Sequence, residues 1–131
     1  MEQRPVCLTI GGSDSCSGAG IQADLRSFEQ LGARGCSAIT ALTAQNPKAV
    51  SRIEPAPLAQ LDAEIHAVFD YYPIAAVKTG MLVDAEHIAV VVAALSEHHD
   101  GGVLIVDPVM ISSSGALLLD GGGRSALQKA L

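Results

Sequence analysis

Aromatic residues and positive charge are both scarce in this sequence. It contains no tryptophan, two tyrosines and two phenylalanines, and its 8 Lys and Arg residues are outnumbered by 14 Asp and Glu residues, for a formal net charge of −6. The basic residues also stand singly along the chain. Because nucleic-acid binding needs clustered positive charge and benefits from stacking rings, these shortages argue against a nucleic-acid partner. A small molecule is the partner that we expect.

Cysteines and long hydrophobic runs are also few. The three cysteines are an odd number and form no C-x-x-C pair, which favours free thiols in a reducing compartment over disulfides or a zinc site. The longest apolar run, Ile88–Leu95, is far shorter than the ~20 residues that span a membrane, and the charged N-terminus does not resemble a signal peptide. We therefore predict a cytoplasmic protein that has no membrane partner.

What the sequence does contain is a regular alternation of two patterns. Hydrophobic residues make up 49% of the chain, which is typical of a packed globule, and 131 residues suit one domain. Short β-rich runs at residues 6–10, 36–42, 75–79 and 103–106 alternate with helical periodicities. This alternation predicts parallel βαβ units, and hence an α/β domain with a mostly parallel sheet and flanking helices.

Four helices are expected between and after these strands. The first ends at Gly32, and the second follows a loop that contains Asn46 and Pro47. The third is capped by Asp84, and the fourth runs from Gly123 to the last residue. The apolar faces predicted for the first three consist of Ile21, Leu25, Phe28 and Leu31; of Leu58, Leu61, Ile65, Val68 and Phe69; and of Ile88, Val91, Val92 and Leu95.

The residues just after each strand are candidates for a binding site, because ligands of parallel α/β sheets sit beyond the carboxyl ends of the strands. A glycine-rich turn from Gly11 to Gly20 leads into the first helix, whose unpaired N–H groups suit ligand binding. The turn lacks the Gly-Lys-Ser/Thr of a Walker A loop and the third glycine of a dinucleotide fingerprint, and no acidic residue follows the second strand. The sequence therefore disfavours a P-loop protein and a Rossmann oxidoreductase.

Several side chains in these segments allow two interpretations. Asp24 lies at the edge of a buried helix face, where its carboxylate either contacts a ligand or is stabilised by the helix N-terminus or a lysine. Gln45 either addresses a heteroaromatic ring or is a solvated loop amide. Lys78 is a phosphate contact or half of an ion pair, and Met81 is a ligand contact or core. Asp107 suits either a Mg²⁺-phosphate or a turn.

Asp14 and the histidines are assigned plainer roles. Asp14 lies within the glycine-rich turn and is expected to stabilise or cap that turn. The histidines fall in helical segments away from the strand ends, so we interpret them as surface residues and keep metal binding as the alternative. They are His66, His87, His98 and His99.

Four motifs in this order resemble one enzyme family. They are G-G-S-D-S-x-x-G-A-G-I-Q-A-D-L, I-T-A-L-T-A-Q-N, V-K-T-G-M-L, and V-D-P-V-M with a later S-G. Together they resemble the hydroxymethylpyrimidine/phosphomethylpyrimidine kinases of thiamine biosynthesis, along essentially the whole chain. The resemblance implies a ribokinase-like fold, with residues 1–131 as the N-terminal part of a single kinase domain.

The resemblance also implies roles for particular residues. Asp24 and Gln45 would address the ring nitrogens and the amino group of a pyrimidine, and Met81 would pack on its ring. Lys78 and Asp107 would lie in the vicinity of the phosphate and the metal. The implied cofactors are ATP and Mg²⁺, and the implied pyrimidine pocket consists of Gly12, Asp24, Gln45, Met81 and Val109.

The reaction implied is the ATP-dependent phosphorylation of 4-amino-5-hydroxymethyl-2-methylpyrimidine and of its monophosphate. The chain departs from the family pattern at Cys16-Ser17, Thr79 and Ala116, and it stops before the half that carries the family's ATP site and anion hole. We therefore expect these 131 residues to be inactive alone, with a non-catalytic pyrimidine-binding relative as the alternative. A half-sheet with an open apolar edge also predicts self-association into a homo-oligomer.

Overall fold

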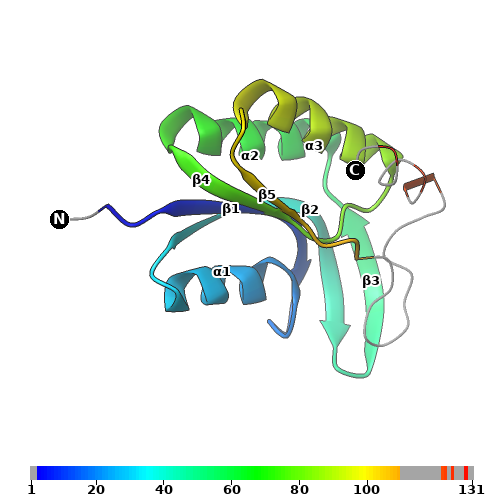
Figure 1. The fold of residues 1–131 in the computed structure, drawn as a ribbon. Coiled ribbons are helices and arrows are strands. Elements are labelled where there is room, and N and C mark those ends of the chain that lie inside the picture. The colour runs from blue at the N-terminus through cyan, green and yellow to red at the C-terminus, as the bar shows by residue number, and fades with distance from the viewer. Residues whose placement is uncertain (1–2, 110–121, 124, 126–128, 130–131) are drawn as a thin grey trace.

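The centre of the structure is a five-stranded sheet. The computed structural model describes residues 3–109, 122–123, 125 and 129, and within them the strand order is β3-β2-β1-β4-β5 (Figure 1). β1 is parallel to β2 and β4, β4 is parallel to β5, and β3 is antiparallel to β2. The strands are β1 Val6–Asp14, β2 Arg34–Asn46, β3 Ala49–Pro55, β4 Ile74–Thr79 and β5 Val103–Val106. The predicted α/β domain with a mostly parallel sheet is confirmed.

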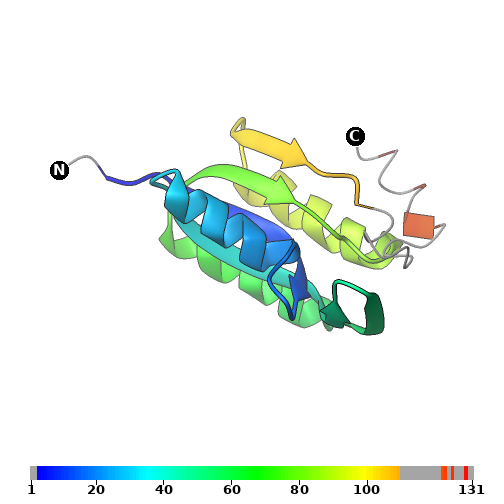
Figure 2. The same cartoon turned by 90° about the horizontal axis from the view of Figure 1, so that it is seen from below.

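Three helices cover the two faces of this sheet. α1 packs on one face against β1 and β2, whereas α2 and α3 lie side by side on the other (Figures 1 and 2). Their bounds are α1 Gly20–Gln30, α2 Leu58–Tyr71 and α3 Ala85–His98. None of the described helices has the length and apolar character needed to cross a membrane. Because the helices return the chain between parallel strands, the carboxyl ends of β1, β2, β4 and β5 meet at one edge.

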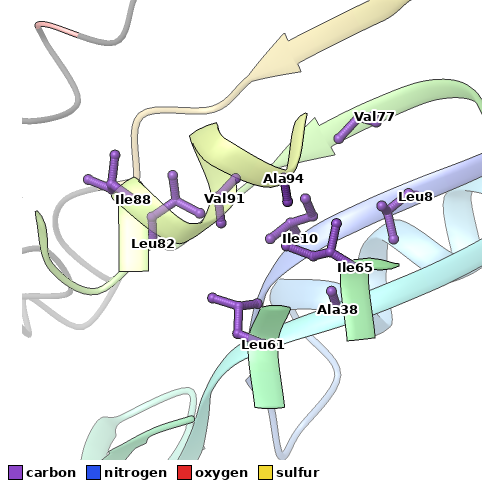
Figure 3. Close-up of a cluster of buried hydrophobic side chains, with 10 residues drawn as sticks. All are labelled: Leu8, Ile10, Ala38, Leu61, Ile65, Val77, Leu82, Ile88, Val91 and Ala94. Carbon is purple, nitrogen blue, oxygen red and sulfur yellow. The ribbon is translucent and has the colours of Figure 1, made fainter. Parts of the chain in front are cut away.

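The hydrophobic core lies between the sheet and the pair formed by α2 and α3 (Figure 3). Leu8 and Ile10 of β1 and Val77 of β4 are fully buried there. Leu61 and Ile65, which are four residues apart on α2, are fully buried against them. Each such side chain contributes roughly 1.5–3 kcal/mol on burial, so this face of the sheet supplies most of the apolar stabilisation.

The predicted apolar helix faces are buried or half-buried except at two positions. Leu31 is 85% exposed because it is the C-cap of α1, beyond the last turn that packs on the sheet. Val92 is 43% exposed because it follows the buried Val91 by one residue, which rotates its side chain by about 100° around the helix. The predicted Asp84 cap is confirmed, since its carboxylate accepts a hydrogen bond from the His87 backbone N–H.

A hairpin replaces the loop that was expected around Asn46 and Pro47. β2 continues to Asn46, and β3 returns antiparallel along it. The Asn46 side-chain oxygen accepts hydrogen bonds from the backbone N–H groups of Lys48 and Ala49, which closes the turn. Pro55 ends this edge strand, where a missing backbone donor is tolerated. The prolines of this segment are what made it resemble a loop.

His87 shows that the interpretation of the histidines as surface residues was wrong. It is 5% exposed, its Nδ1 lies 2.7 Å from an Asp84 carboxylate oxygen, and its Nε2 lies 2.8 Å from the Ala56 carbonyl oxygen. The ring thus ties the start of α3 to the segment before α2. The other three are half-buried: His66, His98 and His99.

β5 is the last strand of the sheet within the described residues. Its Val103, Leu104 and Ile105 side chains are 57%, 46% and 56% exposed. The open apolar edge predicted for the last strand is therefore present in this part of the chain. Ala116 and most of the helix expected from Gly123 lie outside the described residues.

Candidate functional site

The connection from β1 to α1 is organised by the buried Asp14. Its two carboxylate oxygens accept hydrogen bonds from the backbone N–H groups of Cys16 and Ala19, both at 2.8 Å. Ser17 adopts a left-handed conformation with φ 59° and donates its N–H to the Asp14 carbonyl at 3.0 Å. The turn role predicted for Asp14 is confirmed. The turn itself is shorter than expected, because β1 continues through Gly11 and Gly12 to Asp14.

Two positions in this connection require glycine, because other atoms lie where a Cβ would be. Gly20 has φ +64°, and a Cβ on it would lie 2.5 Å from the Gly12 carbonyl oxygen. A Cβ on Gly12 would lie 2.5 Å from the terminal methyl of Met81. Since real Cβ atoms do not approach so closely, the bare Gly12 backbone is what lets the Met81 side chain lie across the end of β1.

Asp24 on α1 is held by Lys78 on β4 and Thr9 on β1. Lys78 Nζ lies 3.0 and 2.8 Å from the two Asp24 carboxylate oxygens, and Thr9 Oγ1 donates to one of them at 2.7 Å. The Asp24 and Lys78 side chains are only 19% and 20% exposed. Such a half-buried charge pair is stable because three hydrogen bonds compensate its desolvation. The ion-pair interpretation is thus confirmed for both residues, and ligand contact by Asp24 stays a prediction.

Gln45 belongs to β2, so its interpretation as a loop amide was wrong. Its side-chain nitrogen donates to Thr43 Oγ1 at 2.8 Å, and Thr43 Oγ1 donates to the Ser13 carbonyl at 2.7 Å. Ser15 Oγ accepts from the Gln45 N–H and lies 2.7 Å from its carbonyl. The amide is therefore oriented by β1 and β2 together. Thr43 was not singled out from the sequence, although its two-residue spacing from Gln45 places both side chains on one face of a strand.

Met81 and Asp107 follow the ends of β4 and β5. The Met81 carbonyl accepts a 2.6 Å hydrogen bond from the buried Thr40 hydroxyl, and the Met81 side chain is buried. The Asp107 N–H donates to the Thr79 carbonyl at 3.0 Å, which continues the pairing of β5 with β4. Its carbonyl accepts from the Val109 N–H at 2.8 Å. Asp107 is exposed, so its carboxylate is accessible from solvent.

These strand ends enclose a cavity of about 330 Å³. This size suits a small organic ligand. Every residue nominated from the sequence lines it: Gly12, Asp24, Gln45, Lys78, Met81, Asp107 and Val109. The lining residues that were not nominated are small or hydroxylic: Gly11, Ser13, Ala19, Gly20, Ala23, Thr43 and Gly80. Apart from the glycines of the turn, no residue type marked these positions in advance.

The side chains that line the cavity carry dissimilar polar groups. They offer one amide, two carboxylates, one ammonium group and the hydroxyls of Ser13 and Thr43, together with the apolar Met81. An amide donates and accepts, a carboxylate accepts from an amino group, and a thioether packs against a ring. This set suits a small amino-substituted heteroaromatic ring. A second hollow of about 590 Å³, lined by residues such as Arg4, Arg34 and Tyr72, contains none of the nominated residues.

Comparison with known proteins identifies the family of this chain. A family profile described as phosphomethylpyrimidine kinase matches residues 14–131. The chain belongs to the phosphomethylpyrimidine kinase family. A hydroxymethylpyrimidine/phosphomethylpyrimidine kinase from Haemophilus influenzae is 54% identical over 79 residues, which cover 60% of this chain and 29% of that protein. The thiamine biosynthesis bifunctional protein of Geobacter sulfurreducens is 51% identical over 88 residues, 67% of this chain and 18% of that protein.

Solved structures extend the likeness to the fold. The crystal structure of phosphomethylpyrimidine kinase from Clostridium difficile superposes with a TM-score of 0.87 at 45% identity, covering 95% of this chain and 53% of that one. Pyridoxal kinase from Staphylococcus aureus, solved in complex with pyridoxal, gives 0.85 at 30% identity, covering 98% and 47%. The predicted ribokinase-like fold is confirmed. The chain spans about half the length of these two kinases.

Proposed function

We propose that the cavity binds 4-amino-5-hydroxymethyl-2-methylpyrimidine and that the chain serves its ATP-dependent phosphorylation, and that of its monophosphate, in thiamine biosynthesis. One observation carries the proposal: the residues that the family resemblance assigns to a pyrimidine pocket line a single cavity at the strand ends. Relatives named as hydroxymethylpyrimidine/phosphomethylpyrimidine kinases share about half of the matched residues. A cytoplasmic location stays a prediction.

The side chains divide the recognition of the ring between them. The Asp24 carboxylate, held in place by Lys78 and Thr9, accepts a hydrogen bond from the 4-amino group. The Gln45 amide, anchored through Thr43, addresses the ring nitrogens. Met81 packs on the face of the ring, in the space that Gly12 leaves open. This arrangement leaves the hydroxymethyl group to face the Asp107 side of the cavity.

Asp107 is the residue here that suits Mg²⁺. It is an exposed carboxylate at the rim, and Mg²⁺ is usually held by one or two carboxylates together with substrate phosphates and water. The ion would neutralise charge on the ATP phosphates. Among the described lining residues the one cation is Lys78, and Asp24 engages it with both oxygens. We therefore expect this chain alone to bind the pyrimidine and to phosphorylate it little or not at all.

The alternative is a relative that keeps the pocket and does not catalyse phosphoryl transfer. The ion pair between Lys78 and Asp24 favours this alternative. Phosphoryl transfer depends on stabilising charge around the transferred phosphoryl group, and the Lys78 ammonium already neutralises Asp24. The kinase and the non-catalytic relative would both bind the pyrimidine. They differ in whether the bound pyrimidine is phosphorylated by Mg-ATP.

Calorimetric titration of the chain with the pyrimidine, with and without Mg-ATP, tests the proposal. We expect saturable one-to-one binding that Gln45→Leu weakens at least about tenfold, the effect of losing one or two buried hydrogen bonds. Gln60→Leu, at an exposed position of α2, is the matched control and should leave binding unchanged. Pyridoxal serves as the competing ligand class. A folded chain that binds pyridoxal and not the pyrimidine would reject the proposed substrate.

We also propose that the chain self-associates through the exposed edge of β5. Unpaired strand edges with apolar side chains on both faces associate readily, and Val103, Leu104 and Ile105 form such an edge. Size-exclusion chromatography with light scattering should give a dimer or larger species at micromolar concentration. Val103→Lys should shift it towards monomer. A wild-type monomer under these conditions would contradict the proposal.

A further inference from the structure

A group of metal-ligand side chains lies on the side of the molecule where α2 packs against α3. His66 comes from α2, and Glu97 and His98 come from the end of α3. His66 Nε2 lies 3.3 Å from one Glu97 carboxylate oxygen, and His98 Nε2 lies 3.8 Å from the other. One ligand atom from each of the three lies within 4.8 Å of the others. α3 begins near the pyrimidine cavity, so its length separates this group from that cavity by roughly 20 Å.

Hydrogen bonding fixes which nitrogen of His66 is available. Its Nδ1 lies 2.9 Å from the Asp62 carbonyl oxygen, which can only accept, so Nδ1 carries the proton. In the neutral ring Nε2 then presents a lone pair to the Glu97 carboxylate, which also presents lone pairs. Two acceptors at 3.3 Å need a cation between them, either a proton or a metal ion. The Asp62 carbonyl and Glu97 accordingly raise the pKa of His66.

His98 supplies a second, independent nitrogen directed at the same carboxylate. Its Nε2 is buried and has no hydrogen-bond partner among the residues that the structure describes. The ring is held by stacking on Phe69, with centroids 5.3 Å apart and planes 11° apart, and by an edge contact with His66 at 4.6 Å. A buried, oriented and unsatisfied imidazole nitrogen is costly unless something binds it. A metal ion that also bound His66 and Glu97 would satisfy all three groups.

We propose that His66 Nε2, His98 Nε2 and a Glu97 oxygen form a binding site for a divalent transition metal, with Zn²⁺ as the reference ion. Two histidines and one carboxylate with an open fourth position are a familiar zinc ligand set. The bond from His66 Nδ1 to a backbone carbonyl is the outer-shell contact that orients a ligating histidine. Donors of a tetrahedral zinc site lie about 3.3 Å apart, so the present spacing requires a small closure. Glu97, which is 64% exposed, is free to make it.

The site is structural in character, because it joins α2 to α3 far from the cavity. Within the described part of the chain, the acidic groups that face the histidines are Asp62, whose carboxylate lies 3.4 Å from His66, and Glu97. These two negative charges favour a dication.

The test is titration of the untagged 131-residue chain with Zn²⁺, followed by calorimetry and by thermal melting. We expect one saturable site, a raised Tm, and at least about tenfold weaker binding in His66→Gln, Glu97→Gln and His98→Gln. His99→Gln, which removes the neighbouring imidazole outside the group, is the matched control and should bind normally. Far-UV circular dichroism without metal verifies that each variant is folded.

Co²⁺ identifies the ligands by absorption. We expect visible bands of a nitrogen and oxygen site without the intense thiolate charge-transfer band that binding at the exposed Cys16 would give. A wild-type chain that does not bind Zn²⁺ at neutral pH, or that binds it equally well after His66→Gln, would overturn the proposal. The group would then be a proton-bridged ion pair only.

Discussion

The two faces of strands β1 and β4 carry different kinds of side chain and serve different purposes. On the side of α2 and α3, β1 and β4 present Leu8, Ile10 and Val77, which are fully buried in apolar contact. On the side of α1, the intervening residues Thr9 and Lys78 instead bind a carboxylate. The alternation of a strand thus places an apolar layer and a polar layer one residue apart. We infer that stability depends mainly on the first face and ligand binding on the second.

The largest effect is expected from the apolar face. Ile65→Ala should lower the free energy of unfolding by about 2–5 kcal/mol, because it leaves a cavity in a fully buried cluster. Urea denaturation measures this change. Val92→Ala, at an exposed position of α3, is the control and should stay within about 0.5 kcal/mol. Pyrimidine affinity of the folded fraction should be unchanged in both variants. A selective loss of affinity in Ile65→Ala would show that the apolar face also determines ligand binding.

The next effect is expected from the polar face, where both properties should change. Lys78→Met leaves the half-buried Asp24 carboxylate with Thr9 and without its cation, which should cost about 1–3 kcal/mol of stability and also weaken pyrimidine binding. The double variant Asp24→Asn/Lys78→Met should recover stability relative to Lys78→Met alone, while its binding stays impaired. A double-mutant cycle by urea denaturation and calorimetry separates the two effects. Additive stability changes would show that the pair is not coupled.

A third substitution should affect binding with little change in stability. Gly12→Ala places a methyl group where the end of Met81 now lies, and the flexible Met81 side chain would move into the cavity. We expect pyrimidine binding at least about tenfold weaker and a loss of stability near 1 kcal/mol. Gly11→Ala, which also lines the cavity but meets only ordinary contacts at 3.6 Å, should have a smaller effect on binding. Equal losses in both variants would contradict this geometry.

The smallest effect concerns pH and the cap of α3. Burial would raise the pKa of Asp84, but hydrogen bonds from the His87 backbone and ring outweigh it, so the pKa is lowered below its usual value. A lowered carboxyl pKa stabilises the fold at pH values above the unfolded pKa of about 4 and loses that contribution as the pH falls through the folded value. Asp84→Asn should therefore reduce the loss of stability that accompanies a fall in pH below about 4, the unfolded pKa of an aspartate. Parallel pH profiles of the two proteins would contradict this.

Local patterns predicted much of the fold and little of the contact network. The strand, turn and helix around Asp14, the Asp84 cap and the apolar faces of α2 and α3 follow from spacing within a few residues. β3 was not predicted, because it is an edge strand that ends in Pro55, and proline at such a position is equally typical of a loop. The Asp24 and Lys78 pair joins residues 54 positions apart, and no local pattern selects between a ligand contact and an ion pair. The buried His87 was missed for the same reason.

We infer that the polar face at the strand ends binds the pyrimidine, and that a substitution there can abolish this binding without unfolding the chain. Calorimetric titration of the wild type and of Gly12→Ala with 4-amino-5-hydroxymethyl-2-methylpyrimidine, both verified as folded by thermal melting, tests it most directly. We predict saturable one-to-one binding to the wild type and strongly weakened binding to Gly12→Ala, whose Tm is lowered by only a few degrees. Absence of binding to the folded wild type, or equal affinity in the two proteins, would contradict the claim.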